Sequence, residues 1–267
     1  MAHNTPKNSF RLMLKNIFLA LKLKYYILLV NTMQMHQLNE SGWAKTYLIY
    51  DQTSGMAAII DPVYDYVANY LSAIEEMNLN LEMCIATHTH ADHITGCFTI
   101  ANQLKCDYVM WHSTPSLGVT KFVNETSVLK LGNETIQFHH VPGHTEDSML
   151  IVTSSQVFTG DFLFTGDGGV GRDDLPSGRM QAHWESLRVI SALPDDLLVC
   201  TGHEAPGVEM QTLGWNKQHN PILKMTSFEE YQKWQNDTTE QLGYVSKIKV
   251  ALPANLFGEI PEDIPWL

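Results

Sequence analysis

The chain has 267 residues, of which 44% are apolar, so it can bury a full hydrophobic core in one large or two small domains. Acidic residues outnumber basic residues by 29 to 17, which gives a formal charge of −12. We therefore expect no nucleic-acid partner, because binding phosphates needs a basic surface. No run of 18 or more apolar residues occurs, so we expect no membrane span.

Residues 1–35 are interpreted as a basic leader or extension. Residues 1–39 contain five basic side chains and no acidic one: Lys7, Arg11, Lys15, Lys22 and Lys24. This composition is typical of an organelle transit peptide and equally compatible with an extension ahead of a start at Met33 or Met35. We expect a cytoplasmic protein, or a mitochondrial-matrix protein if residues 1–35 are a transit peptide, with residues 36–267 forming the folded domain.

The first half of that domain is predicted to alternate short strands with amphipathic helices. Residues 45–51 and 56–61 are apolar runs joined by a Thr-Ser-Gly turn, which indicates two strands. Apolar residues recur at helical spacing within residues 66–77, and residues 94–104 also have a helical pattern. Between these helices, residues 81–87 form an apolar run that predicts a strand leading into a histidine-rich loop.

The second half continues with short apolar runs separated by turn residues. Strands are predicted at residues 135–141, 149–152, 157–159 and 197–200, and a helix at residues 181–193. A glycine-rich loop, residues 166–171, follows the third of these strands. Many short strands with a few helices between them indicate an α/β sandwich, and no linker divides residues 40–267.

The segment Thr87-His88-Thr89-His90-Ala91-Asp92-His93 directly follows a predicted strand. Alternate residues of an extended loop project to one side, so His88 and His90 can face one centre, and Asp92 and His93 a neighbouring point. Imidazole and carboxylate are the ligands that suit zinc and divalent iron. The sequence therefore predicts a metal site in this loop, in preference to a solvated polar loop that is histidine-rich by chance.

At three later positions, a histidine or an aspartate again follows the end of a predicted strand. They are His144 in Val-Pro-Gly-His-Thr, Asp161 in Phe-Thr-Gly-Asp and His203 in Thr-Gly-His. Each motif alone is a common turn sequence. Together they predict that the loops at several strand ends present ligands to one site on a rigid sheet scaffold.

In this order, the four motifs resemble those of the metallo-β-lactamase superfamily over residues 36–258. The resemblance implies an α/β fold, a four-layer αββα sandwich in a single domain, with the metal site at one edge between two sheets. Within the superfamily, the chain most resembles the persulfide dioxygenases, which are sulfur dioxygenases. The further matches are residues 90–96, Gly171-Arg172, Asp174, Asn220-Pro221 and residues 250–255.

The dioxygenase resemblance implies one Fe(II) per chain, held by His88, His144 and Asp161. Three protein ligands on one face of the ion leave positions free for a sulfur substrate and dioxygen. The implied reaction oxidises the outer sulfur of a glutathione persulfide, or a related thiol persulfide, to sulfite. The other motif residues would orient ligands or shuttle protons: His90, Asp92, His93 and His203. A homodimer is possible.

A second enzyme class uses the same residues. In the thioester hydrolases of the glyoxalase II type, the four additional residues would complete a second site for zinc or mixed metals, and a metal-bound hydroxide would attack the thioester. Those hydrolases carry a separate helical domain after the motifs, which is not obvious in this sequence. A metal-binding member without activity is the third alternative, and it is disfavoured because every ligand position is filled.

Arg172 is the candidate for contacting a substrate carboxylate, and the alternative is a structural ion pair with Asp173 or Asp174. Several residues depart from the dioxygenase pattern, so basic and hydroxyl groups expected at the glutathione pocket are partly missing. The departures are Glu204-Ala205, Ile222, residues 256–258 and two additional residues before Arg172, including Asp167. We expect structural roles for His139, His140, His183 and Trp184, and buried, inert thiols at Cys84 and Cys200.

Overall fold

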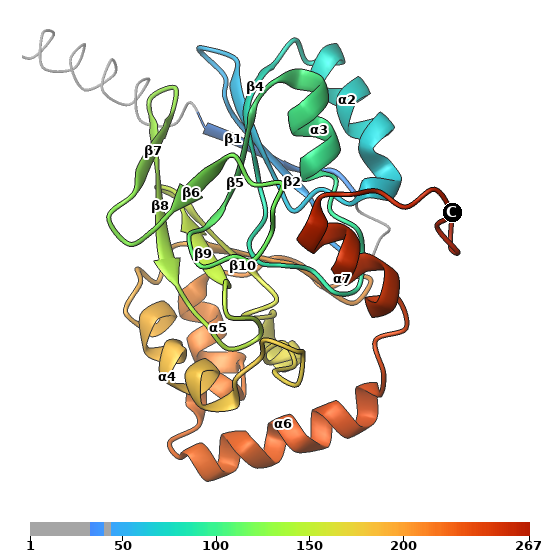
Figure 1. Cartoon of the computed structure of the whole chain (residues 1–267). Helices are drawn as coiled ribbons and strands as arrows, with labels where there is room; N and C mark the ends of the chain where they lie inside the picture. The colour runs from blue at the N-terminus through green and yellow to red at the C-terminus, as the bar shows by residue number, and fades with distance from the viewer. Residues whose placement is uncertain (1–32, 40–43) are drawn as a thin grey trace, which may run out of the picture.

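The computed structural model describes residues 33–39 and 44–267. In this part of the chain, six strands form a first sheet in the order β1-β2-β3-β4-β5-β6 (Figure 1). Their bounds are β1 Met33–Gln37, β2 Tyr47–Asp51, β3 Met56–Ile60, β4 Asn80–Ile85, β5 Asp107–Trp111 and β6 Lys121–Val123. The pairs from β3 to β6 are parallel, and β1, β2 and β3 are antiparallel neighbours.

The second sheet has five strands in the order β11-β10-β9-β8-β7. Their bounds are β7 Val128–Leu131, β8 Glu134–His140, β9 Met149–Val152, β10 Gln156–Gly160 and β11 Leu198–Thr201. Strands β7 to β10 are antiparallel neighbours, whereas β11 pairs in parallel with β10. Because β10 and β11 run in parallel, Asp161 and His203 leave the sheet at the same edge.

The main hydrophobic core lies between the two sheets. Ile49, Ile60 and Val109 of the first sheet pack with Phe138 and Phe158 of the second, and all five are almost completely buried. Alternate residues of the central strands face a second apolar layer on the other side of each sheet, which explains why these strands are nearly continuous apolar runs.

Helices cover the outer face of each sheet. Helices α2, Val67–Glu76, and α3, Cys97–Leu104, pack on the first sheet through side chains that include Tyr70 and Ile100. Helices α4, Met180–Ser191, and α5, Leu213–His219, cover the second sheet, and α6, Phe228–Leu242, packs against α4 on the side away from the sheet (Figure 1). The expected four-layer αββα sandwich is confirmed. Short 3-10 turns occupy Tyr64–Tyr66, Gly166–Gly168 and Ile222–Lys224.

The sequence patterns did not predict the helices after the last motif. Helices α5 and α6 belong to the outer layer on the second sheet, where Leu213 and Tyr231 are buried. Helix α7, Ile248–Phe257, lies near α3, and its Ala251 and Ala254 pack against Ile94 beside the histidine-rich loop (Figure 1). These helices therefore complete the sandwich and the site.

The predicted strands and helices of the central region agree with the structure to within a few residues. Strand β1 begins at Met33 and pairs with β2, inside the segment that we interpreted as a leader or extension. The rest of that segment, residues 1–32, lies outside the described residues. Among the described helices, none has the length and apolar character needed to cross a bilayer.

Candidate metal centre

The histidine-rich loop after β4 is fixed at its start by two buried carboxylates. Asp61, at the end of β3, accepts hydrogen bonds from the backbone nitrogen and the hydroxyl of Thr87, both at 2.7 Å. Asp147 accepts from the backbone nitrogen of Thr89 at 3.2 Å and from its hydroxyl at 2.5 Å. Because these partners come from different parts of the fold, the loop has one well-defined path past the site.

Asn255 of α7 fixes the other end of the loop. Its side-chain amide donates to the carbonyl oxygens of His90 and His93, both at 2.9 Å, and its own oxygen accepts from the backbone nitrogen of Thr95 at 2.8 Å. Asn255 is buried, so these bonds satisfy backbone groups that water does not reach. Residues 250–255, which match the dioxygenase pattern, therefore include a residue that holds the histidine-rich loop in place.

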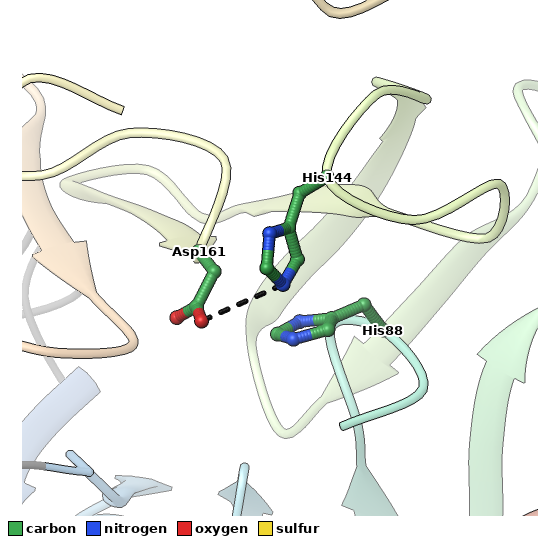
Figure 2. A group of neighbouring side chains, drawn as sticks. All are labelled: His88, His144 and Asp161. Carbon is green, nitrogen blue, oxygen red and sulfur yellow. Dashed lines mark ion pairs between the residues drawn. The ribbon is translucent and has the colours of Figure 1, made fainter. Parts of the chain in front are cut away.

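Three of the predicted ligands form a compact group, which we name the first cluster: His88, His144 and Asp161. Their ligand atoms all lie within 4.8 Å of one another, and all three residues are buried (Figure 2). His144 Nε2 lies 3.6 Å from Asp161 Oδ2, and the rings of His88 and His144 meet edge to face. The structure therefore brings together three strand ends that are far apart in sequence.

The outer hydrogen bonds of both imidazoles orient their free nitrogens. The hydroxyl of Thr87 donates to Asp61, so at 3.0 Å it accepts from His88 Nδ1. His144 Nδ1 donates to the carbonyl oxygen of Arg172 at 2.6 Å. In both rings Nε2 is then left with its lone pair, and His88 Nε2 is buried without a hydrogen-bond partner. A lone pair held in this way is the arrangement of a metal ligand.

His90, Asp92 and His93 form the second cluster, again with ligand atoms within 4.8 Å of one another. His90 Nε2 lies 3.2 Å from Asp61 Oδ1, and His93 Nδ1 lies 3.1 Å from Asp92 Oδ2. The other nitrogen of each ring, His90 Nδ1 and His93 Nε2, is buried without a hydrogen-bond partner. Both clusters therefore offer imidazole and carboxylate donors that fit Fe(II) or zinc.

His203 connects the two clusters. Its Nδ1 lies 2.7 Å from Asp161 Oδ1, and its Nε2 lies 3.0 Å from Asp92 Oδ2. Burial lowers the pKa of His203, but the two carboxylates outweigh burial and raise its pKa well above the usual value. His203 thus hydrogen-bonds to one carboxylate of each cluster.

For most of the other imidazoles, burial has a larger effect on the pKa than the nearby charges have. It lowers the pKa of His88, His144 and His93 below the usual value, because a charged ring would lose its hydration. Burial opposes ionisation of Asp161, but the charge and hydrogen bond of His203 hold the pKa of that carboxyl well below its usual range. The first cluster therefore contains neutral imidazoles and an ionised carboxylate.

Two motif glycines allow the strand ends to converge. Gly160 has φ +50°, and a Cβ at this position would lie 2.3 Å from the hydroxyl oxygen of Thr87. A Cβ on Gly202 would lie 2.3 Å from Asp161 Oδ1. Close packing thus requires glycine before both Asp161 and His203, and at Gly160 the positive φ requires it as well.

A cavity of about 380 Å³ opens on both clusters. Asp92, His144, Asp161 and His203 lie on its polar side. The remaining wall is mostly apolar and consists of Phe164, Val170, Leu175, Leu242 and Val245, with glycines 168 and 171, Thr238, Arg172 and Ala91. Helix α6 and the segment after it therefore form part of the cavity wall.

Arg172 lines this cavity but is already paired. Its Nε and Nη2 donate to the two carboxylate oxygens of Asp174 at 2.6 and 2.7 Å, and Nη1 donates to the carbonyl oxygen of Gly243 at 2.8 Å. This geometry is the structural ion pair that we weighed against a substrate contact. It also ties the end of α6 to the loop that carries the carbonyl partner of His144.

The other side chains that we set aside have local partners. His183 is fully buried in α4, its Nε2 lies 3.0 Å from the carbonyl oxygen of Phe162, and burial lowers its pKa to about 3. His140 Nε2 lies 2.7 Å from the carbonyl oxygen of Glu146, and its ring stacks on Trp111. The cysteines have free thiols, and burial raises the pKa of Cys84 and Cys200. Cys84 and Cys200 are buried, as expected.

Sequence reasoning missed Asp61 and Asp147 as supports of the site and cited Asn255 only as part of a motif. Asp61 has φ +49°, an uncommon conformation for a residue other than glycine. Its position between a predicted strand and Pro62 indicated only a strand end. Its roles depend on contacts 26 and 29 residues away along the chain, to Thr87 and His90, which no local pattern reveals.

Residues 44–203 match the sequence model of the metallo-beta-lactamase superfamily. The chain belongs to this superfamily. The match contains both clusters and His203, so the histidine and aspartate groups described above are those of a metal-binding superfamily.

The similar proteins within the superfamily are named for different activities. The mitochondrial persulfide dioxygenase ETHE1 of Mus musculus is 29% identical over 79% of this chain and 82% of its own length. The hydroxyacylglutathione hydrolase GloC of Haemophilus influenzae is 30% identical over 67% of this chain and 92% of its own length. A beta-lactamase hydrolase-like protein of Agrobacterium fabrum is 28% identical, and the matched region spans 59% of its length.

The crystal structure of ETHE1 from Myxococcus xanthus superposes on this chain with a TM-score of 0.77 at 32% identity. The superposition covers 84% of this chain and 97% of that protein. The metallo-β-lactamase fold is therefore shared almost over the full length of the ETHE1 structure.

Proposed function

We propose that this chain is a mononuclear iron(II) dioxygenase that oxidises the outer sulfur of a thiol persulfide. His88, His144 and Asp161 would hold the iron. Two imidazoles and one carboxylate are the ligand set of non-haem iron oxygenases that keep open coordination positions. The similarity to proteins named persulfide dioxygenase, in sequence and in fold, supports this assignment over other oxygenase reactions.

The observation that carries the proposal is the first cluster, in which two free imidazole nitrogens and one carboxylate oxygen converge. His203 hydrogen-bonds to Asp92 Oδ2 and to one oxygen of Asp161, Oδ1. The other, Oδ2, is the oxygen that lies near His144 Nε2. Oδ2 is therefore the carboxylate oxygen that would bind the iron together with the two free imidazole nitrogens.

The overall reaction is balanced as R–S–SH + O2 + H2O → R–SH + SO3²⁻ + 2 H⁺. The outer sulfur loses the electrons that dioxygen gains, and the S–S bond breaks to release the thiol. Bound Fe(II) would mediate electron transfer from the sulfur to dioxygen and provide adjacent coordination positions for both. Thr87 and the Arg172 carbonyl hold the two ligand rings, His203 holds Asp161, and the apolar wall of the cavity limits access of water.

A second candidate function is the hydrolysis of a thioester by two metal ions. It is favoured by the buried nitrogens of the second cluster, His90 Nδ1 and His93 Nε2, which have no hydrogen-bond partner. It is also favoured by the 30% identity to a hydroxyacylglutathione hydrolase. In this reaction His203 would bind the second metal together with the second cluster.

Paired assays separate the two reactions. Iron-loaded protein is supplied with a panel of thiol persulfides in an oxygen-electrode cell, and sulfite is measured in the same samples. The same protein is supplied with S-lactoylglutathione, and thioester loss is followed without oxygen. We expect equal molar amounts of oxygen consumed and sulfite formed, with no thioester loss. Thioester cleavage without oxygen uptake would establish the hydrolase instead.

A further inference from the structure

The described residues around the metal clusters carry very few positive charges. Three further cavities adjoin the one over the clusters, with volumes of about 610, 410 and 570 Å³, and each shares wall residues with it. Arg172 is the one lysine or arginine among the residues that line these four cavities. The carboxylates that line them are Asp92, Glu146, Asp147, Asp161, Asp167, Asp174, Glu204, Glu209 and Glu240.

The charge of Arg172 is neutralised within the protein. Its two bonds to Asp174 are bidentate, and the third bond reaches the carbonyl oxygen of Gly243. Paired guanidinium and carboxylate groups present little net charge to the cavity. A substrate carboxylate would have to replace Asp174 in order to use this arginine.

The backbone donors beside the cavity are also engaged. The 3-10 turn Gly166–Gly168 begins next to the cavity, and free amides at such a turn can hold an anion. Here the backbone nitrogen of Thr165 donates to Glu204 at 2.8 Å, and that of Gly166 donates to Asn216 at 2.9 Å. A side-chain carboxylate of the protein itself therefore takes the place of a substrate anion.

The wall that faces the clusters is suited to an apolar group. Leu242 and Val245 come from α6 and the segment after it, and Val170 and Leu175 come from the loops on either side of Arg172. Burial of apolar substrate surface against them is favourable, whereas a substrate carboxylate would face the carboxylates of the surrounding cavities.

We propose that the thiol persulfide oxidised here carries an apolar body and no carboxylate, unlike glutathione persulfide. This inference rests on the proposed function and specifies its substrate class. The outer sulfur would lie at the first cluster, and the organic group would lie against Leu242 and Val245.

The test compares benzyl persulfide with glutathione persulfide on the iron-loaded protein, using oxygen uptake and sulfite formation. We expect kcat/KM to be at least about tenfold higher for benzyl persulfide, with most of the difference in KM. Equal or higher kcat/KM for glutathione persulfide would overturn the inference and leave the dioxygenase reaction intact.

A binding measurement separates failure of this inference from failure of the proposed function. Benzyl mercaptan and glutathione, which lack the outer sulfur, are titrated into the protein by calorimetry without oxygen. We expect tighter binding of benzyl mercaptan. If it binds more tightly but no persulfide supports oxygen uptake, the dioxygenase proposal fails and the preference of the cavity stands. If glutathione binds more tightly, the inference fails whatever the reaction.

A pair of variants tests the wall directly. Leu242→Arg places a cation in the cavity wall, and Gln241→Arg adds the same charge to the neighbouring exposed position of α6, which does not line these cavities. We expect Leu242→Arg to reduce the benzyl-to-glutathione ratio of kcat/KM several-fold, and Gln241→Arg to leave it unchanged. An unchanged ratio in both variants, or the same change in both, would contradict substrate contact with this wall.

Discussion

The two clusters contain similar side chains but are built in different ways. In the first cluster, His88, His144 and Asp161 follow three different strands, and all are buried. In the second cluster all three residues belong to one loop, and the Asp92 side chain is 37% exposed. Asp92 Oδ2 also has both His93 and His203 as partners. Convergence of rigid strand ends gives a preorganised ligand set, whereas the local cluster has a more exposed carboxylate with two imidazoles on one of its oxygens.

Removing a ligand from each cluster gives the largest expected difference. In His144→Ala or Asp161→Ala we expect nearly complete loss of bound iron, because one of three protein ligands is removed. In His93→Ala we expect most of the iron to remain. The measurement is iron content per chain after identical loading and desalting, with circular dichroism to check folding.

Two outcomes would contradict the expected difference in iron content between variants of the two clusters. Full iron content in both first-cluster variants would mean that these residues do not hold the ion. Equal loss in His93→Ala would mean that the second cluster holds metal as firmly as the first, as the hydrolase alternative requires.

Asp61 supports both clusters, so its removal should destabilise the fold and weaken the site together. Asp61→Ala leaves three buried donors, on Thr87 and His90, without their acceptor. We expect the free energy of unfolding to fall by about 3 kcal/mol and iron affinity to fall by roughly 10-fold to 100-fold. Urea unfolding and iron titration measure the two effects, with Glu76→Ala on the exposed face of α2 as the control.

If Asp61→Ala unfolds like the control, the hydrogen bonds of this carboxylate do not hold the loop. Asp61→Asn keeps one acceptor and sharpens the test, since we expect it to lose less stability than the alanine variant.

The sequence predicted the candidate metal ligands more completely than the residues that hold those ligands in place. Apolar runs and turn residues located the strands before His88, Asp161 and His203, because these signals are local. The hydrogen bonds from Asp61 and Asn255 join positions far apart in the chain, so no periodic pattern indicates them. Helix α6 was missed because it packs through a few residues, including Tyr231 and Gln235, and most of its surface is polar.

We expect acid to destabilise the structure around the first cluster by protonating His183. This ring lies against Gly143 and the carbonyl of Phe162, which neighbour His144 and Asp161. Its folded-state pKa of about 3 is below the unfolded value of about 6.5, so its stabilising contribution is complete above pH 6.5 and is lost as pH falls toward 3.

Urea unfolding of the wild type and His183→Gln at pH 7 and pH 5 measures this effect. We expect the wild type to lose about 2 kcal/mol more than the variant between these pH values. Identical losses would show that His183 is not held neutral in the fold.

Arg172 gives the smallest expected effect. Because its ion pair with Asp174 is partly exposed, Arg172→Ala and Asp174→Ala should each cost about 0.5 kcal/mol of stability and leave iron content unchanged. Steady-state kinetics completes the test. We expect similar KM values in both variants, whereas a KM increase confined to Arg172→Ala would assign the guanidinium to substrate binding.

The most direct test of a single iron in the first cluster is the number and identity of metal ions per chain. Elemental mass spectrometry is applied to protein expressed with iron and zinc both present and purified without added metal. We expect one iron per chain and less than a tenth of an equivalent of zinc. Two metal ions per chain, in any combination, would contradict the mononuclear site.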